Sequence, residues 1–556
     1  MDELLVDSIK NFKSNPNKSL IFIVVLAFVL TFLVVYLNST ENILGRFHRD
    51  IYLYLIEALH FNGYVFHEFR YVNILSPLIP FLTSLAFKLG FVSEIPIFVI
   101  TGVFFFFSIV GMFYLLRLRF DDVFSVVGVC VFCSFTVIMR WAGNGSIDLP
   151  SVCLWIWGMY FFIKAMDCNQ KFFYLSIPLL VLSVFAKYVT IVTIPLVFVY
   201  FVSRGDFVFN LRKYLKNIVG GFLVGLVCTV PFVYFYFTRN VFRIVSSYAK
   251  PVYSTGSAVH TVNDFLFYVL NLNEIIFRYH DLVGVLYLLV MFVGVFCSLY
   301  CVYKILKCYR SGGNLDLFRG KMSYVFVFVS IVGMVLSFVL TRDYSTTFCV
   351  PLFYVFSCIF AVCFNSIVGF YNESGGERYD GFSFDFMMFV WFMSHFVFLS
   401  AFLVKTHRYG IAFTPPLAFF ITYGFKRIYD FIPEKRGVFK SVFPHIVILV
   451  MLVVSFGHLT IDSHDDWVDD EKYVARWMED NWDLDEVNIW ADRPVYSWYL
   501  QKDYHYVEDR GDVNNLSVDM LNASVDYYIS HEPNLVIPHY PKVMEINSVI
   551  FYKCDC

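Results

Sequence analysis

The sequence predicts an all-α polytopic membrane bundle of about 13 transmembrane helices, followed by a small exterior α/β domain. The 556 residues are 58% hydrophobic and only 16% charged, with a mean hydropathy of +0.65. A soluble protein of this length cannot bury so much apolar surface, so most of that surface must face lipid. Long apolar stretches recur up to about Thr460, and beyond that residue acidic residues and Trp become frequent.

The predicted spans are the apolar stretches long enough to cross about 30 Å of hydrocarbon. Their approximate positions are 19–37, 96–118, 123–140, 149–165, 171–186, 189–203, 218–238, 281–303, 322–341, 345–369, 384–403, 410–428 and 441–461. The segment from Ile74 to Leu89 is also apolar, but Pro77, Pro80 and Lys88 favour an interfacial or re-entrant helix. Before it, Ile51 to His60 is expected to form an amphipathic helix on the surface.

The charges of the loops orient this bundle. Lys and Arg concentrate on the side of the N-terminus, for example near Arg117, Lys213 and Lys435. The positive-inside rule therefore places the N-terminus in the cytoplasm, and an odd number of spans places the C-terminal segment outside. We divide the chain into a membrane domain, residues 1–460, with a first outer loop at about 38–95, and an exterior domain, residues 461–556.

The exterior domain is predicted from a change of periodicity. The stretch from Trp467 to Trp482 has the pattern of an amphipathic helix. Short runs rich in β-branched and aromatic residues predict strands at 487–490, 525–529 and 549–552.

Two acidic residues stand at corners on the predicted outer side. Asp50 ends the segment Arg-Phe-His-Arg-Asp after the first span, and Asp148 precedes Leu-Pro at the start of another. Ionisable residues beside a membrane cavity usually have a function, because each is unfavourable in lipid. Two simpler interpretations remain open: Asp50 is a solvated loop residue, or Asp148 only caps the helix that begins near Pro150.

Cations gather on the same side. The corner Lys405-Thr-His-Arg408-Tyr409 precedes two prolines, and the planar fork of Arg408 suits phosphate oxygens. Further candidates for a phosphate site are Arg70, Arg140 and Lys187. The simpler alternative for Arg408 is an interfacial arginine that snorkels toward water.

Metal and cofactor motifs are absent from the sequence pattern. Cys130 and Cys133 have CxxC spacing, but both lie inside the predicted apolar span at 123–140, so we do not interpret them as metal ligands. The outer loops hold no convincing Asp-x-Asp motif, so we predict no cofactor and name no metal ligand, although dependence on a divalent metal stays open.

The order of these features resembles the GT-C integral-membrane glycosyltransferases, particularly the branch of protein O-mannosyltransferases and lipid A aminoarabinose transferases. The resemblance covers roughly residues 15–460 and implies a helical bundle whose large first outer loop holds interfacial helices. It implies that Asp50 is the loop acid essential to catalysis and that Asp148 is a second acid near the active site. It also implies that Arg408 and Tyr409 correspond to the Arg-Tyr pair that the family carries at a later outer corner.

The sequence departs from that family at two places. The first loop of the family often reads Asp-Glu, whereas Ile51 follows Asp50 here. Bacterial members often carry a Glu-Lys pair before the prolines, where this chain has Arg70-Tyr-Val-Asn. Arg70 is therefore our candidate to replace the lysine at the donor phosphate.

The resulting hypothesis is a glycosyltransferase that moves a sugar from a polyprenyl (dolichyl-type) phosphate donor to an acceptor on the outer face of the membrane. The acceptor is a lipid, a glycan or a protein, and the other partners are membrane lipids rather than nucleic acid. The alternative is a polytopic transporter or a flippase for lipid-linked sugars, which would place charges near the bilayer midplane in two matching halves. A purely structural scaffold leaves the clustered outer charges unexplained.

Overall fold

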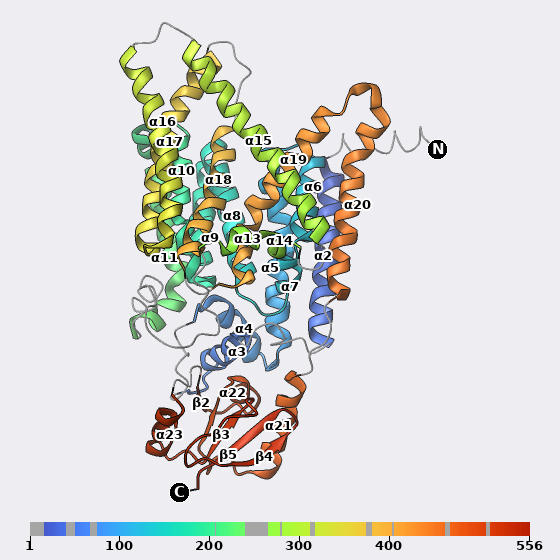
Figure 1. Ribbon diagram of the computed structural model, residues 1–556, viewed down its shortest axis with the longest axis vertical. Coiled ribbons are helices and arrows are strands. Elements are labelled where there is room, and N and C mark those ends of the chain that lie inside the picture. Colours follow the sequence, from blue (N-terminus) through green and yellow to red (C-terminus); the bar gives the residue numbers. More distant parts are fainter. Residues whose placement is uncertain are drawn as a thin grey trace.

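The computed structural model describes residues 16–40, 50–66, 75–205, 207–238, 265–277, 281–311, 317–373, 381–402, 405–461, 467–507 and 512–555. Long helices form a bundle up to Ile461, and a small sheet with its own helices follows. Two short helices, α3 and α4, lie between the bundle and this C-terminal unit (Figure 1). We call the end of the bundle next to them the domain-facing end.

Eighteen α-helices follow one another along the described part of the chain up to Ile461. They are α2 (Pro16–Thr40), α3 (Asp50–Phe61), α4 (Leu78–Lys88), α5 (Ile95–Leu116), α6 (Asp122–Ser134), α7 (Thr136–Trp141), α8 (Asp148–Asp167), α9 (Phe173–Ala186), α10 (Ile194–Ser203), α11 (Phe207–Thr238), α13 (Phe267–Leu270), α14 (Leu272–Ile276), α15 (Asp281–Ser311), α16 (Leu317–Val339), α17 (Thr346–Glu373), α18 (Phe382–Ala401), α19 (Thr414–Phe431) and α20 (Gly437–Ile461). Short 3₁₀ turns join some of them: η1 (Gln170–Phe172), η2 (Tyr188–Thr193), η3 (Leu340–Arg342), η4 (His407–Phe413) and η5 (Glu434–Arg436).

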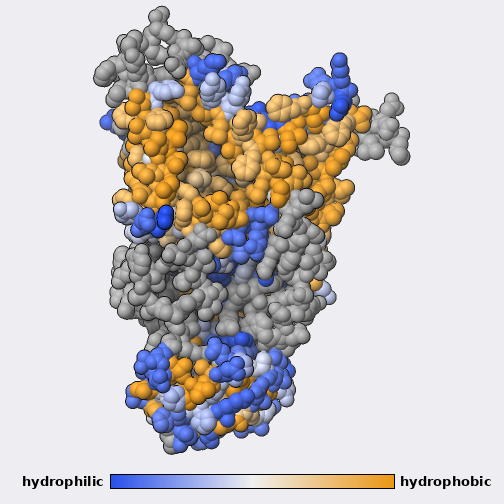
Figure 2. Space-filling view, viewed as in Figure 1, coloured by the Kyte–Doolittle hydropathy of each residue, from blue (hydrophilic) through white to orange (hydrophobic). Residues whose placement is uncertain are grey.

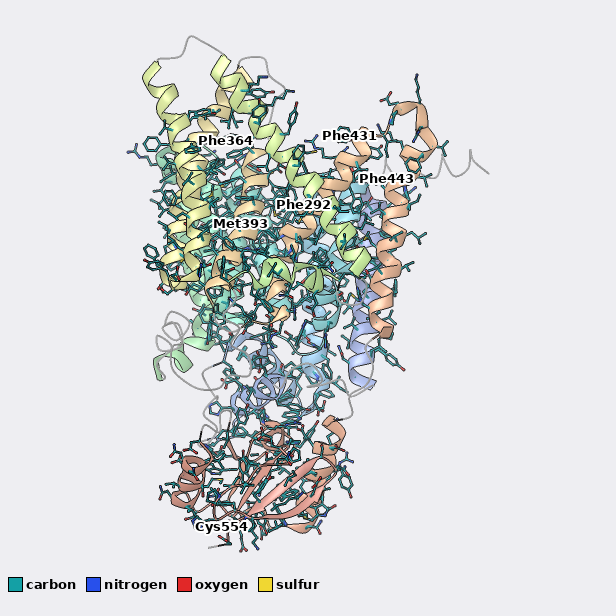
Figure 3. All side chains as sticks on the ribbon, viewed as in Figure 1. Phe292, Phe364, Met393, Phe431, Phe443 and Cys554 are labelled. Carbon is teal, nitrogen blue, oxygen red and sulfur yellow. The ribbon has the colours of Figure 1, made fainter. Side chains whose placement is uncertain are left out.

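Nine helices in the described ranges are long and apolar enough to cross a membrane. Large apolar side chains stay exposed along the bundle; Phe292 on α15 is 61% exposed and Phe431 at the end of α19 is 74% exposed (Figure 3). The space-filling view shows this apolar surface as a broad band over the bundle, with polar residues at its far end and on the C-terminal unit (Figure 2). The chain is therefore an integral membrane protein, and the predicted helical bundle with a small C-terminal sheet unit is confirmed.

The predicted number of 13 spans is not confirmed. The stretch predicted as one span at 123–140 is two helices, because the backbone at Phe135 is extended (φ −69°, ψ 126°) between α6 and α7. The 13 residues of α6 reach only about 20 Å at 1.5 Å per residue. The helices α9 and α10 are similarly short, with 14 and 10 residues. Nearly all of α6 is buried by neighbouring helices, so this helix does not have to span the hydrocarbon in contact with lipid.

The helix α3 differs from the expectation of a surface helix. Every residue from Ile51 to Leu59 is buried. The helix packs on α4 on the bundle side, and α22 of the C-terminal unit covers it from the other side. An amphipathic pattern alone could not reveal this second partner.

The C-terminal unit is built on a five-stranded sheet with the order β2-β1-β3-β5-β4. Its elements are α21 (Trp467–Asn481), β1 (Ile489–Ala491), α22 (Val495–Tyr499), β2 (His505–Tyr506), α23 (Val513–Asn522), β3 (Tyr527–Ser530), β4 (Lys542–Ile546) and β5 (Val549–Lys553). Strand β1 pairs in parallel with β2 and β3, whereas β5 is antiparallel to both β3 and β4. The predicted helix and three strands are present within two residues of their expected positions, and β2 and β4 are additional.

The C-terminal unit docks on the domain-facing end through aromatic side chains. Trp498 stacks on Phe87 of α4 with 5.8 Å between ring centroids, and its indole donates a hydrogen bond of 3.2 Å to Glu94. The Tyr499 and Tyr52 hydroxyls lie 3.3 Å apart. One hydrophobic cluster thus runs from α3 and α4 into the sheet unit, and it holds the helix that begins at Asp50.

Candidate active site

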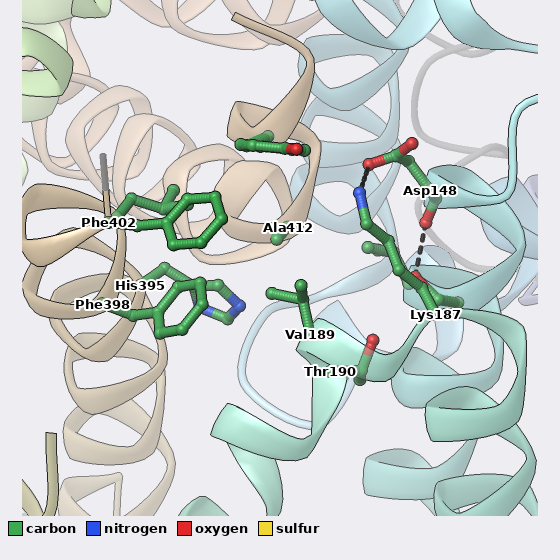
Figure 4. Close-up of a pocket in the computed structure, with 12 residues that line it drawn as sticks. Asp148, Lys187, Val189, Thr190, His395, Phe398, Phe402 and Ala412 are labelled. Atoms are coloured by element: carbon green, nitrogen blue, oxygen red, sulfur yellow. Dashed lines mark hydrogen bonds and ion pairs between the residues drawn. The ribbon is translucent and has the colours of Figure 1, made fainter. Parts of the chain in front are cut away.

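Asp148 stands in the first turn of α8, and only 5% of its side chain is exposed. Its carboxylate accepts a hydrogen bond of 2.9 Å from the Ser146 hydroxyl and forms an ion pair with Lys187 (Figure 4). The N-cap position of α8 is Ile147, without a side-chain cap. Capping is therefore not the role of Asp148, whose carboxylate is directed at cations instead.

Lys187 reaches this carboxylate from the C-terminal end of α9. Its ammonium group also lies 4.6 Å from the centre of the Tyr409 ring, a favourable cation–π geometry. Burial lowers the pKa of the Lys187 amine, and the Asp148 carboxylate offsets part of that change. A buried lysine of this kind holds its position through its partner.

Arg408, on η4, connects both acids. Its Nη2 donates a hydrogen bond of 3.0 Å to Oδ2 of Asp50, and its Nε lies 3.6 Å from Oδ2 of Asp148. The guanidinium also lies over the ring of Trp141, 5.3 Å from its centre. Only 13% of the Arg408 side chain is exposed, so it does not snorkel toward water.

The charge of Arg408 is secured by its neighbours. Burial alone would lower the pKa of the guanidinium, but Asp148 and Asp50 raise it well above its usual value. The Nη1 atom of Arg408 is buried and has no hydrogen-bond partner among the described residues. The site therefore contains a permanent cation with donor capacity left for an anionic ligand.

Asp50 is the more accessible of the two acids. It is the first residue of α3, and 40% of its side chain is exposed. Its contact with Arg408 joins the start of α3 to the corner that follows α18. A carboxylate that is both ion-paired and accessible can meet a substrate, whereas the buried Asp148 carboxylate cannot do so without a rearrangement.

A cavity of about 170 Å³ opens beside Arg408. Arg140, near the end of α7, lines it together with Arg408, so two guanidinium groups face one space. Its other lining residues are Thr136, Val137, Trp141, Glu274, Ile275, Thr406 and His407. Two guanidinium groups on one cavity have the charge and shape that suit an anionic group such as a phosphate.

A second, mostly apolar pocket adjoins Asp148 and Lys187 on another side of Tyr409. Phe398 and Phe402 of the α18 end, His395 and Ala412 stand across this pocket from Lys187 (Figure 4). Tyr409 also lines this pocket, and its ring centre lies 4.6 Å from the Lys187 ammonium and 5.7 Å from the Arg408 guanidinium, so the apolar pocket adjoins the cationic corner.

Lys405 does not line the cavity. The Lys405 amine donates hydrogen bonds of 2.5 and 2.9 Å to the carbonyls of Leu399 and Ser400 at the end of α18. Its positive charge thus stabilises the C-terminus of that helix, where carbonyl groups are unpaired. Arg70 lies outside the described residues. Of the eight residues predicted for the site, six meet here: Asp50, Asp148, Arg140, Lys187, Arg408 and Tyr409.

The sequence prediction named two of the nine residues that line the cavity, and those it missed include Trp141, Glu274 and His407. The first and third directly adjoin predicted residues and could have been included with them. Glu274 stands in a short polar stretch before the span at 281–303, and that acid was the available signal. In the described part of the chain, no group of three or more His, Cys, Asp or Glu residues is placed to hold a metal ion.

Comparison with solved structures decides the fold. The apo crystal structure of ArnT from Cupriavidus metallidurans aligns with 96% of this chain and 97% of its own chain, at a TM-score of 0.50 and 13% sequence identity. This chain has the fold of a GT-C membrane glycosyltransferase. The resemblance predicted from the sequence is confirmed at the level of the fold.

Two further comparisons accompany it. The crystal structure of the same ArnT bound to undecaprenyl phosphate aligns over the same shares, at a TM-score of 0.49 and 12% identity. Residues 75–235 match the family model described as dolichyl-phosphate-mannose-protein mannosyltransferase, and this stretch includes Arg140, Asp148 and Lys187. No curated protein sequence matches the chain.

Proposed function

We propose that this protein is a glycosyltransferase that takes a hexosyl or pentosyl group from a polyprenyl phosphate and passes it to a hydroxyl acceptor. The observation that carries the proposal is the bridge made by Arg408 between Asp50 and Asp148, beside a cavity that Arg140 also lines. The family match over residues 75–235 supports the same donor class, since that family is described by a dolichyl-phosphate-linked mannose. ArnT, whose fold this chain shares, has been crystallised with undecaprenyl phosphate.

The chemistry is an in-line displacement at the anomeric carbon. The acceptor oxygen forms a bond to that carbon while the bond to the phosphate oxygen breaks, and the lipid phosphate leaves with the electron pair. Asp50 accepts the proton of the acceptor hydroxyl. Arg408 and Arg140 stabilise the negative charge that grows on the leaving phosphate, in a site where little water screens it.

Asp148 and Lys187 have a positioning role in this account. Their buried ion pair fixes the end of α8 against the end of α9, and the same carboxylate holds the Nε side of Arg408. The guanidinium therefore presents its Nη atoms to the cavity and to Asp50. The pairing of Arg408 with Asp50 holds the Asp50 carboxylate beside the cavity until the donor phosphate binds.

The location of the site agrees with a lipid-linked donor. Asp50, Asp148, Lys187 and Arg408 all stand at helix ends, at the domain-facing end of the bundle. At this depth a phosphate can rest at the interface while its prenyl tail remains in the bilayer. From the loop charges we assign this end to the outer side, with the N-terminus in the cytoplasm and residues 461–556 as an exterior domain. A transporter or flippase would instead place its charged residues near the midplane.

The test is to incubate membranes that contain the protein with labelled polyprenyl-phosphate sugars and to trace the label. The proposal predicts that the label leaves the lipid phosphate and appears on a lipid, glycan or protein acceptor. Label that crosses the membrane but stays on the polyprenyl phosphate would instead identify a flippase and contradict the proposal.

A further inference from the structure

The cavity beside Arg408 also contains a carboxylate. Glu274, on α14, lines the same space as Arg140 and Arg408. Next to it, Nε2 of His407 lies 3.2 Å from Oε2 of Glu274. The imidazole ring packs against Phe267, with 5.5 Å between ring centroids, so His407 has a fixed orientation.

Stability does not explain this pair. The side chains of His407 and Glu274 are 40% and 43% exposed. An ion pair with that much solvent contact contributes about 0–1 kcal/mol to folding. By contrast, the nearby pair of Asp148 and Lys187 is almost fully buried. The Glu274 carboxylate is therefore accessible to whatever enters the cavity, and part of the imidazole ring is exposed there, although its Nε2 atom is buried.

A carboxylate is unfavourable in a cavity that binds only a phosphate, because like charges repel. It becomes favourable when another part of the ligand carries hydroxyl or amino groups, since a carboxylate accepts hydrogen bonds from both. His407 can donate or accept a hydrogen bond at the same place. The volume of about 170 Å³ exceeds the roughly 10–15 Å³ that a single water requires, so the space holds more than solvent bridges.

We propose that Glu274 and His407 bind the sugar of the donor, while Arg408 and Arg140 bind its phosphate. The proposal rests on the glycosyltransferase function proposed above and specifies the sugar class. The sugar is uncharged or carries an amino group, because a uronic acid would place its carboxylate against Glu274.

The experiment compares binding of bare undecaprenyl phosphate with binding of three undecaprenyl-phosphate glycosides that carry mannose, an aminopentose or glucuronic acid. Wild-type protein, Glu274→Gln and His407→Gln are measured in the same detergent. Asp343→Asn is the matched control, since it removes an exposed acid at a different corner of the bundle. Thermal unfolding of each variant verifies that the fold is retained.

We expect wild-type protein to bind the mannose or the aminopentose donor more tightly than the bare lipid phosphate. Each variant should lose about tenfold in affinity for that glycoside, the usual effect of one hydrogen bond to a charged group. Affinity for bare undecaprenyl phosphate should not fall in either variant, and in Glu274→Gln it should rise, because a carboxylate that repels the phosphate is removed. The control should behave as wild type.

Three results would overturn the sugar site: equal binding of all glycosides and the bare lipid, tightest binding of the glucuronic acid donor, or full retention of the glycoside preference in both variants. None of them removes the phosphate site, because that site is measured with the bare lipid. Failure of wild-type protein to bind any undecaprenyl phosphate would contradict the proposed function itself.

Discussion

Arg408 donates a hydrogen bond of 3.0 Å to Asp50 although the two residues stand 358 positions apart in the sequence. The contact joins the start of α3 to the corner after α18, and it places the accessible acid beside the cationic cavity. This relationship has consequences that can be tested one residue at a time.

Asp50→Asn should reduce sugar transfer by about 10²–10⁴-fold, the usual contribution of a general base. The amide keeps the shape of the side chain and its contact distance to Arg408 but cannot accept a proton. Binding of undecaprenyl phosphate should stay close to that of wild type. Turnover is measured at saturating donor, with Asp343→Asn as a control for loss of an acid elsewhere. Near-normal turnover in Asp50→Asn would show that Asp50 is not the base and would support the simpler interpretation of a solvated acid.

Arg408→Lys should weaken donor binding by about 10–100-fold, even though the positive charge is kept. An ammonium group cannot contact Asp50, Asp148 and a phosphate at the same time through a planar fork. The apparent KM for the donor should rise more than the KM for the acceptor. A variant with wild-type dependence on donor concentration would end the assignment of Arg408 to the phosphate.

Asp148→Asn should destabilise the protein by about 3–5 kcal/mol, because it leaves the buried charge of Lys187 uncompensated. Lys187→Met should destabilise it less, because Arg408 remains 3.6 Å from the Asp148 carboxylate. Asp148→Asn and Lys187→Met should each lower the Tm and the activity, and the double variant should recover part of the Tm. The matched control is the ion pair of Arg119, just after α5, with Asp385 in the first turn of α18. Nε of Arg119 lies 2.7 Å from Oδ1 of Asp385. Arg119→Met should lower the Tm with little change in activity. Additive effects of Asp148→Asn and Lys187→Met on the Tm would show that the two groups are not coupled.

Tyr499→Phe should lower kcat about fivefold with little change in the donor KM, a modest effect consistent with the loss of one hydrogen bond. The Tyr499 hydroxyl contacts Tyr52, two residues beyond Asp50 on the same helix. The C-terminal unit would thereby position the base without touching the substrate. Tyr473→Phe, at a position on α21 that is 55% exposed, is the matched control. Equal kcat values for the two variants would show that this contact does not position Asp50.

The sequence was sufficient to predict the class of the fold and most of the charged site. Corners between apolar spans, together with the loop charges, place Asp50, Asp148 and Arg408 at the same end of a bundle. Sequence spacing does not reveal which corners of one end are neighbours, because that depends on how the helices pack. For this reason the turn of Lys405 toward the end of α18 and the approach of Glu274 to His407 were not predicted.

The number of spans and the burial of α3 could not be predicted for a related reason. Hydropathy does not distinguish a lipid-facing crossing from a short helix that neighbouring helices bury, as in α6. The apolar faces of α3 are shared between α4 and α22, and the second partner comes from a distant part of the chain. Local sequence pattern contains no information about such a partner.

The most direct test of the account is an experimental structure of the protein with bound undecaprenyl phosphate. The account predicts that phosphate oxygens lie within hydrogen-bond distance of Arg408 and that Arg140 faces the same phosphate. It further predicts that Asp50 is released from Arg408 and faces the open side of the cavity. A phosphate bound elsewhere, with the contact between Asp50 and Arg408 still intact at about 3 Å, would contradict the central claim.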